Sequence, residues 1–402
     1  MNMQRRSILS AGLLAAWPLG LRATPKIRIT GIDLLPVRAT TRTVWLIVRL
    51  RSDQGLVGLG EASDAFGFAR TTKEDALRME SELRKFFAFI QGSSPLDIEA
   101  YRQKAEPLAA AGGLLSATAY SAIEQAMWDL AGQALEIPTY ALFGGKVRDR
   151  LAIYANINRA TLPRTPEGFA LTAKRAVAEG FGAVKAAPFD GFPKPGSSAS
   201  EISSAVDLGI ACVAAIRAAV GADVEVMVDC HSFFDVPMAK SVAKRLEPFN
   251  LAWYEEPVAP ERTAETLEIR RSIRQEMAGG EILFGTKGFA PLCRNRAVQV
   301  IMPDVKHCGG LLELSRIAAM AQADGVNVAP HNPSGPVATA ASVQVCAGMS
   351  QFRILELQWG EVGWRSELIV PAERFEKGTI AVPTMPGFGI RLNEQVARAH
   401  PL

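Results

Sequence analysis

The sequence predicts an α/β protein in which a (β/α)8-type barrel, modified from the TIM-barrel plan, follows an N-terminal α+β capping domain. From about residue 150, eight short apolar runs alternate with helical stretches, and such alternation implies parallel strands joined by right-handed crossovers. The alternation lasts for roughly 200 residues, the size of such a barrel. A doubly wound open sheet is the alternative, but no GxGxxG segment follows the first run. The runs are 151–155, 183–185, 225–230, 251–255, 276–281, 299–302, 326–329 and 353–356.

The first part of the chain has a different pattern, which predicts the capping domain at residues 24–148. Three stretches have strand character, and Asp53-Gln54-Gly55 is a hairpin signal between the last two. Apolar residues then recur at helical spacing. We expect strands at 27–36, 43–50 and 56–62, and helices at about 72–90, 95–106 and 116–134. The barrel is assigned to residues 149–365, and the Pro- and Gly-rich segment 366–402 is expected to return to the capping domain.

Residues 1–23 have the pattern of an export signal. Arg5 and Arg6 precede an apolar run from Ile8 to Leu21 that is too short to span a bilayer comfortably. The pair of arginines is typical of a twin-arginine signal, which exports folded proteins. We therefore expect a periplasmic protein that is not embedded in the membrane. A cytoplasmic protein with an apolar N-terminal arm is the alternative.

The composition excludes several classes of function. The net charge is +3, but the first 23 residues hold three arginines and no acid, and the remaining 41 Lys and Arg balance 41 Asp and Glu. A neutral body gives no electrostatic basis for binding nucleic acid or an anionic membrane. The five cysteines are widely separated and form no CxxC pair. This spacing argues against a disulfide scaffold and against a zinc ribbon.

Three carboxylates lie at the ends of successive apolar runs. Asp229, Glu255 and Glu281 follow one another at intervals of 26 residues, so one repeated strand–helix unit places them on adjacent strands at the same level. Three carboxylates crowded into a pocket repel one another. A hard divalent cation removes that repulsion, and oxygen-only ligands suit Mg²⁺. We predict that these acids bind Mg²⁺; three unrelated loop charges are the alternative.

Histidines also gather at the ends of the runs. The chain has only four, and His231, His307 and His331 lie at or just beyond strand ends. The sixth run ends at Asp304, on the strand next to that of His331. A carboxylate beside a histidine orients the ring and raises its basicity. The pattern predicts an Asp304–His331 pair, with Glu356 at the end of the eighth run.

Several of these segments resemble the enolase superfamily, in its mandelate racemase/muconate lactonizing enzyme branch, over nearly the whole chain after the signal. The segment around His331 is the most specific of them. Together with Asp229-x-His231 and Glu356, it is most similar to the acid-sugar dehydratases of the galactonate dehydratase type. The matching segments are Ala126-Met127-Trp128-Asp129-Leu130-Ala131, Leu142-Phe143-Gly144-Gly145, Glu255-Glu256-Pro257, Gly280-Glu281, Pro303-Asp304, Gly309-Gly310 and Ala329-Pro330-His331-Asn332-Pro333-Ser334-Gly335-Pro336.

The resemblance implies one Mg²⁺ per subunit and a small-molecule carboxylate, a sugar acid, as the substrate. In that family the first Glu of Glu-Glu-Pro is a metal ligand, so Glu255 is assigned to the metal and Glu256 to a place behind it. The substrate carboxylate would bind the metal, which stabilises the enediolate formed when the α-proton leaves.

The resemblance also implies the roles of the remaining residues. His331, held by Asp304, would be the base that removes the α-proton. Glu356 would hydrogen-bond the substrate carboxylate and help to stabilise the enediolate. His231 would be the general acid that protonates the departing 3-hydroxyl. The expected product is a 2-keto-3-deoxy acid, so the expected enzyme is a lyase.

One position departs from the racemases of this branch. They carry Lys-x-Lys at the end of the second strand, with the second lysine as a base on the opposite face, and here Ala187 occupies that place. A two-base racemase is therefore disfavoured. Lys185 is expected to support the substrate carboxylate or the metal-binding acids. Epimerisation or lactone cycloisomerisation, with His231 or Lys185 as partner, stays open, as does a non-catalytic periplasmic sugar-acid binding protein.

The capping domain of this family covers the barrel mouth and selects the substrate. Residues 61–70 are expected to form that cover, with Arg70 near a distal hydroxyl or carboxylate of the substrate. The loop at 188–196 is a second candidate for specificity. His307 is expected to line the pocket without reacting. We also expect a homo-oligomer.

Overall fold

The computed structural model describes residues 25–67 and 71–402, and the N-terminal part of this range is the predicted α+β unit. Its three strands form an antiparallel sheet in the order β1-β2-β3, and three helices follow, so the predicted elements are confirmed to within a few residues at each end. They are β1 (Ile29–Arg38), β2 (Val44–Ser52), β3 (Val57–Glu61), α1 (Lys73–Phe87), α2 (Ile98–Ala111) and α3 (Gly113–Ala134).

Helix α3 packs directly on β3 because two glycines leave room for its backbone. A Cβ atom at Gly58 would lie 2.1 Å from the carbonyl oxygen of Ala126, and one at Gly60 would lie 2.0 Å from that of Ala122. No side chain fits at either place, so the helix and the strand approach more closely than side chains would permit. This contact sets the position of Glu61, at the end of β3, relative to the barrel.

All eight predicted barrel strands are present and parallel. The barrel closes because β11 pairs with β4, and a parallel bridge joins Val328 of β10 to Phe352. The strands are β4 (Arg150–Asn156), β5 (Ala183–Ala186), β6 (Glu225–Asp229), β7 (Trp253–Glu255), β8 (Met277–Gly279), β9 (Val300–Ile301), β10 (Asn327–Val328) and β11 (Leu355–Gln358).

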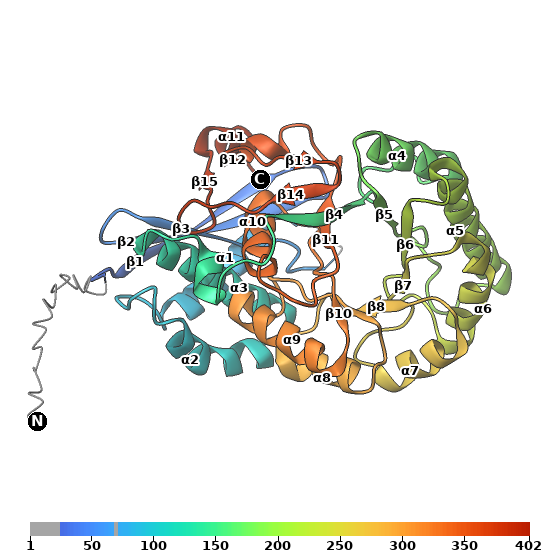
Figure 1. Cartoon of the computed structure of the whole chain (residues 1–402), viewed down its shortest axis with the longest axis horizontal. Helices are drawn as coiled ribbons and strands as arrows, with labels where there is room; N and C mark the ends of the chain where they lie inside the picture. The colour runs from blue at the N-terminus through green and yellow to red at the C-terminus, as the bar shows by residue number, and fades with distance from the viewer. Residues whose placement is uncertain (1–24, 68–70) are drawn as a thin grey trace, which may run out of the picture.

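Helices cover the outside of the barrel, and α4 to α9 form an outer arc around the strands (Figure 1). One helix lies between each pair of successive strands, and the short helix η2 (Glu247–Phe249) extends the third of them. The helices are α4 (Pro166–Ala178), α5 (Ala199–Val220), α6 (Val236–Leu246), α7 (Thr263–Ser272), α8 (Gly285–Arg294), α9 (Gly310–Asp324) and α10 (Pro336–Cys346). The barrel interior is filled by large side chains such as Tyr154, Met227 and Trp253.

The last barrel unit differs from a complete (β/α) unit. Within the described residues, β11 is followed by a turn at Gly360 (φ +73°) and the short helix η3 (Arg365–Leu368), not by an α-helix. The sequence predicted that Glu356 ends the eighth strand. Strand β11 instead continues to Gln358, and Glu356 is its second residue. The pairing of Gln358 with Asn156 of β4 explains the extension.

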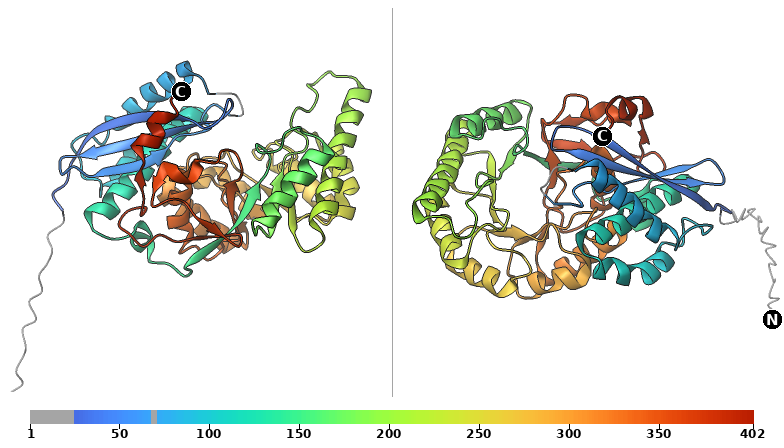
Figure 2. Two further views of the ribbon diagram at one scale, coloured as in Figure 1. Left: turned by 90° about the horizontal axis from the view of Figure 1, so that it is seen from above. Right: turned by 180° about the vertical axis from the view of Figure 1, so that it is seen from behind.

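The C-terminal segment contacts both the barrel and the capping domain. Strand β14 (Thr379–Ala381) pairs antiparallel with the first half of β4. The end of the chain returns to β1, where the Arg38 amide donates to the His400 carbonyl at 2.8 Å, and Figure 2 shows it beside the cap strands. The remaining elements are η1 (Thr139–Phe143), β12 (Ile369–Val370), β13 (Phe375–Glu376), β15 (Arg391–Leu392) and α11 (Glu394–Ala399).

One described helix, α5, is long and apolar enough to cross a bilayer by length and composition alone. It packs against α4 and α6 in the outer layer of the barrel, and its buried residues include Val206, Cys212, Val213 and Ile216. Its apolar character is therefore accounted for in part by packing within the barrel.

Asp129 joins three parts of the molecule, and we predict that its loss destabilises the fold. The buried carboxylate accepts hydrogen bonds from the amides of Leu59 (2.9 Å) and Phe388 (2.7 Å) and from Gln133 (3.0 Å). Asp129→Ala leaves two buried amides without acceptors, which should lower the free energy of unfolding by roughly 2–4 kcal/mol. Urea unfolding measures the change. The exposed Asp149→Ala variant is the control, and equal stability of the two variants would contradict this account.

Candidate metal centre and active site

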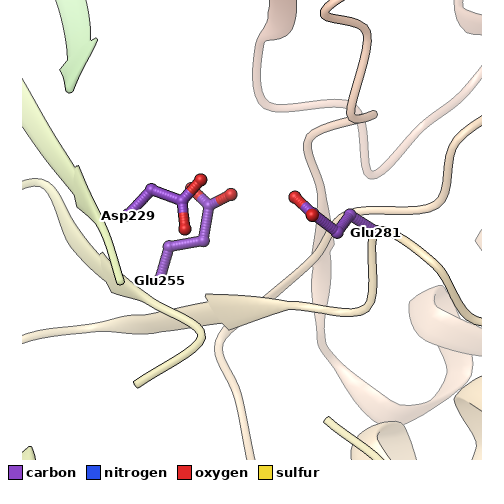
Figure 3. Close-up of side chains that lie close together, drawn as sticks. All are labelled: Asp229, Glu255 and Glu281. Carbon is purple, nitrogen blue, oxygen red and sulfur yellow. The ribbon is translucent and has the colours of Figure 1, made fainter. Parts of the chain in front are cut away.

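Three carboxylates meet at the carboxyl end of the barrel. Asp229 and Glu255 are the last residues of β6 and β7 and pair in register, while Glu281 lies two residues beyond β8. All three are buried, and one oxygen of each lies within 4.8 Å of the others. Figure 3 shows the carboxylate of Glu281 pointing toward those of Asp229 and Glu255. The predicted cluster is therefore present, but only Asp229 and Glu255 lie at the same level. Glu255 pairs with Ala278, and Glu281 reaches the cluster from three residues further along the chain.

The chemistry of this cluster suits a hard cation. Burial, followed by the charge of Asp229, raises the pKa of Glu255 well above its usual range. Glu281 Oε2 is buried and has no hydrogen-bond partner among the described residues, although His331 Nε2 lies 3.1 Å away. A buried carboxylate oxygen without a donor is costly unless a cation satisfies it. The three acids could therefore hold a metal ion with oxygen ligands.

The side chain of Glu256 holds the backbone next to this cluster. Its Oε1 accepts hydrogen bonds from the backbone amides of Gly280 (2.6 Å) and Glu281 (3.3 Å). The residue has a positive φ of +36°, an uncommon conformation for a residue with a Cβ. Its side chain thus fixes the backbone that presents the carboxylate of Glu281.

The ammonium group of Lys185 lies beside these acids. Its Nζ lies 2.8 Å from Glu255 Oε1, 3.1 Å from Glu356 Oε1 and 3.9 Å from Asp229 Oδ2. The side chain is buried, and although burial alone would lower its pKa, the neighbouring carboxylates raise that pKa well above its usual range. Lys185 is therefore charged and links the carboxylate cluster to Glu356.

His331 and Asp304 form a hydrogen-bonded pair. His331 Nδ1 lies 2.8 Å from Asp304 Oδ2, which directs Nε2 toward Glu281. Burial opposes protonation of His331, but the negative charges of Glu281 and Glu356 and the bond to Asp304 raise its pKa to about 9. A carboxylate that holds one ring nitrogen leaves the other free for proton transfer.

Glu356 lies between the lysine and the histidine loop. Its Oε1 accepts a hydrogen bond from Asn156 at 2.6 Å, and its Oε2 accepts one from the amide of Asn332 at 3.0 Å. Burial opposes ionisation, but the positive charges of Lys185 and His331 and these donors hold its pKa below the usual range. Glu356 is therefore an ionised, fixed group beside the centre.

His231 lies at the opposite end of the cluster from His331. It follows β6 with a φ of +44°, and its Nε2 is 3.0 Å from Asp229 Oδ2. Its Nδ1 is 2.5 Å from Asp190 Oδ1. Burial would lower its pKa, but Asp229 and Asp190 raise it well above the usual range. A protonated imidazole in this place can donate a proton.

The remaining sequence candidates lie in different surroundings. His307 is buried, with Nδ1 2.9 Å from Thr118 Oγ1 and Nε2 3.9 Å from Asp304 Oδ2. Burial lowers its pKa to about 4, so it is neutral at neutral pH. Ala187 is buried after β5, and Arg70 lies outside the described residues.

Two charged residues at the site were not predicted as its members. Asp190 lies in the loop at 188–196, which had been considered only for specificity, and it forms the contact with His231 described above. Lys306 is fully buried, with Nζ 3.2 Å from both Asp304 Oδ2 and Asp64 Oδ2. A lysine is usually exposed, so the residue type gave no indication that Lys306 belongs to the site. Only its position two residues after Asp304 could have indicated this.

Comparison with known proteins agrees with this architecture. Residues 28–144 match the family model of the mandelate racemase/muconate lactonizing enzyme N-terminal domain, and residues 168–396 match the enolase C-terminal domain-like model. A D-xylonate dehydratase from Haloferax volcanii is 31% identical over 89% of this chain and 85% of its own length. A D-galactonate dehydratase from Ralstonia pickettii is 31% identical over 87% of this chain and 89% of its own length.

Solved structures show the same fold. A mandelate racemase/muconate lactonizing enzyme from Jannaschia sp. has a TM-score of 0.82 and 30% identity, covering 93% of this chain and 98% of its own. A mandelate racemase/muconate lactonizing enzyme from Sulfitobacter sp. has a TM-score of 0.82 and 28% identity, covering 93% of this chain and 96% of its own. The resemblance expected from the sequence is thus confirmed, and the chain belongs to the mandelate racemase/muconate lactonizing enzyme family of the enolase superfamily.

Proposed function

We propose that this protein is a Mg²⁺-dependent dehydratase that converts a sugar acid to a 2-keto-3-deoxy acid. The observation that carries the proposal is a buried carboxylate cluster with a carboxylate-paired histidine at each end, His331 with Asp304 and His231 with Asp190. The substrate class is supported by relatives that are named D-xylonate, D-gluconate and D-galactonate dehydratase.

Asp229, Glu255 and Glu281 would hold the Mg²⁺. Bound there, the ion would stabilise the negative charge that develops on the substrate carboxylate when the α-proton leaves. Lys185 stands beside the cluster and would donate to that carboxylate. Glu356 would hydrogen-bond it only in the protonated form, because an ionised carboxylate accepts hydrogen bonds and donates none. Engaging Glu281 as a ligand would also offset the strongest of the charges that raise the pKa of His331, so that the imidazole can accept a proton near neutral pH.

The protein groups account for both proton transfers. His331 Nε2 takes the proton from the α-carbon, while Asp304 holds Nδ1. The electron pair of that C–H bond first delocalises into the substrate carboxylate, and it then forms the new C–C double bond when the bond to the 3-hydroxyl breaks. His231 donates its proton to the hydroxyl, which leaves as water. The resulting enol tautomerises to the 2-keto-3-deoxy acid.

Two observations favour this outcome over the isomerases of the family. Ala187 has no group that could act as a second base, and Lys185 is held in ion pairs with Glu255 and Glu356. His231 has an acidic partner at each ring nitrogen, which suits a proton donor. A binding protein without activity would not need either histidine–carboxylate pair.

We predict that the two histidines separate the steps of the reaction. His331→Asn should lower both α-proton exchange in D2O and dehydration by about a thousandfold, because the base is gone. His231→Asn should lower dehydration about a hundredfold but retain α-proton exchange, because only the departure of the hydroxyl needs its proton. NMR of a sugar-acid panel with Mg²⁺ measures both rates. Parental dehydration in the His231 variant would contradict the acid role, and wash-in of deuterium without loss of water in the parent would indicate an epimerase.

We predict that Mg²⁺ binds more tightly as the pH rises. Glu255 and His331 have raised pKa values, so they hold protons at low pH. Binding of the cation requires loss of the Glu255 proton, and it disfavours the protonated form of His331 because it offsets the charge of Glu281. The affinity for Mg²⁺ should therefore be weaker at about pH 6 than at about pH 8, with net release of protons. Calorimetry in two buffers that differ in ionisation enthalpy measures both quantities. Equal affinity at the two pH values without proton release would contradict the prediction.

We further propose export to the periplasm by the twin-arginine route, which rests on Arg5 and Arg6. The Arg5→Lys/Arg6→Lys double variant should stay in the cytoplasm, because the export machinery reads the arginine pair. Cell fractionation measures this, and unaltered export would contradict the proposal. The expected homo-oligomer stays a prediction that light scattering can check.

A further inference from the structure

Four charged side chains form a continuous line from the capping domain to the predicted base. Asp64 Oδ2 lies 3.2 Å from Lys306 Nζ, which lies 3.2 Å from Asp304 Oδ2, and the same oxygen is 2.8 Å from His331 Nδ1. Asp64 belongs to the turn at residues 62–67 after β3, which we call the cap turn. The other three side chains belong to the barrel.

Lys306 holds both oxygens of Asp304. Its backbone amide donates to Oδ1 at 2.7 Å, and its ammonium lies against Oδ2. The lysine side chain is fully buried, so it cannot contact solvent or a substrate in the pocket. A buried ammonium needs counter-charges, and among the described residues the two carboxylates within contact distance are Asp304 and Asp64.

The conformation of the cap turn places the carboxylate of Asp64 against the barrel residue Lys306. Asp64 has a φ of +62°, and the amide of Gly67 donates to its carbonyl at 3.1 Å. Just before the turn, the buried Glu61 accepts hydrogen bonds from the amides of Gly335 (2.7 Å) and Ala338 (2.9 Å), in the loop and helix that follow His331. The segment from Glu61 to Asp64 therefore contacts both Lys306 and the backbone that follows His331.

We propose that Lys306 is a positioning residue that couples the contact of the cap turn with the barrel to the alignment of the His331–Asp304 pair. The inference rests on the proposed function of His331 as the base. With Asp64 in place, the ammonium is shared between two carboxylates. Without Asp64, its counter-charges are Asp304 and the more distant Glu61, and it competes with His331 for Oδ2. The base is therefore correctly held only when the cap turn is seated over the site.

Three variants test this coupling. Lys306→Met should lower kcat for α-proton removal about tenfold and change KM less than about twofold, because the side chain orients the base and does not touch substrate. Asp64→Asn should lower kcat in the same direction. In the double variant the combined loss should be smaller than the product of the two single losses, because both substitutions break the Asp64–Lys306 ion pair. Asp64→Asn also breaks the pair of Asp64 with Arg159. Two losses that multiply, or an unchanged kcat in Lys306→Met, would overturn the proposal.

Amide hydrogen exchange gives a second measurement that needs no substrate. Lys306→Met and Asp64→Asn should each raise exchange in the cap turn, including the Gly67 amide, about tenfold relative to the parent. Asp33→Asn is the matched control, since it removes a cap carboxylate that pairs with Arg51 on the outer face of the sheet. Unchanged exchange in both variants would overturn the coupling. A response in exchange, with no turnover of any sugar acid by the parent, would contradict the proposed function and leave the coupling intact.

Discussion

The repulsion among three buried carboxylates is the constraint on which the rest of this site depends. The backbone places Asp229, Glu255 and Glu281 too close together for all to be ionised without compensation. Their positions are set by the pairing of β6, β7 and β8 and, for Glu281, by the side chain of Glu256. The barrel framework therefore holds the acids together whether or not their charge is offset. A divalent cation is the compensation that this donor set accepts best.

The groups around the cluster are arranged in response to that charge. Lys185 offsets part of this charge and also contacts Glu356. Its ammonium group therefore links Glu356 to the carboxylate cluster. The two histidines lie at opposite ends, next to Asp229 and Glu281, and each has a second carboxylate at its other ring nitrogen. This arrangement gives both imidazoles a defined orientation. The proposed elimination of water assigns His331 as the base and His231 as the acid.

Much of this site could be predicted from the sequence because barrel geometry converts spacing into position. The interval of 26 residues predicted three acids at the same level of adjacent strands, which holds for Asp229 and Glu255 but not for Glu281, three residues beyond the partner of Glu255. The neighbouring sixth and seventh strands placed Asp304 beside His331. The contact of Asp190 with His231 could not be predicted, because it depends on the path of a long loop. Lys306 was missed because only its two counter-charges, one of them from another domain, make the burial of a lysine tolerable. The strand position of Glu356 was misplaced because the apolar run gave no sign that pairing with β4 continues to Gln358.

The proposed cation site consists of Asp229, Glu255 and Glu281 and would bind one ion per chain. Titration of the protein with Mn²⁺, followed by electron paramagnetic resonance, tests it directly, because free and bound Mn²⁺ give distinct signals and Mg²⁺ should displace the bound ion. We expect about one tight site per chain in the parent and none in Glu281→Gln, with the fold retained. Undiminished Mn²⁺ binding in that variant, or no tight site in the parent, would contradict it.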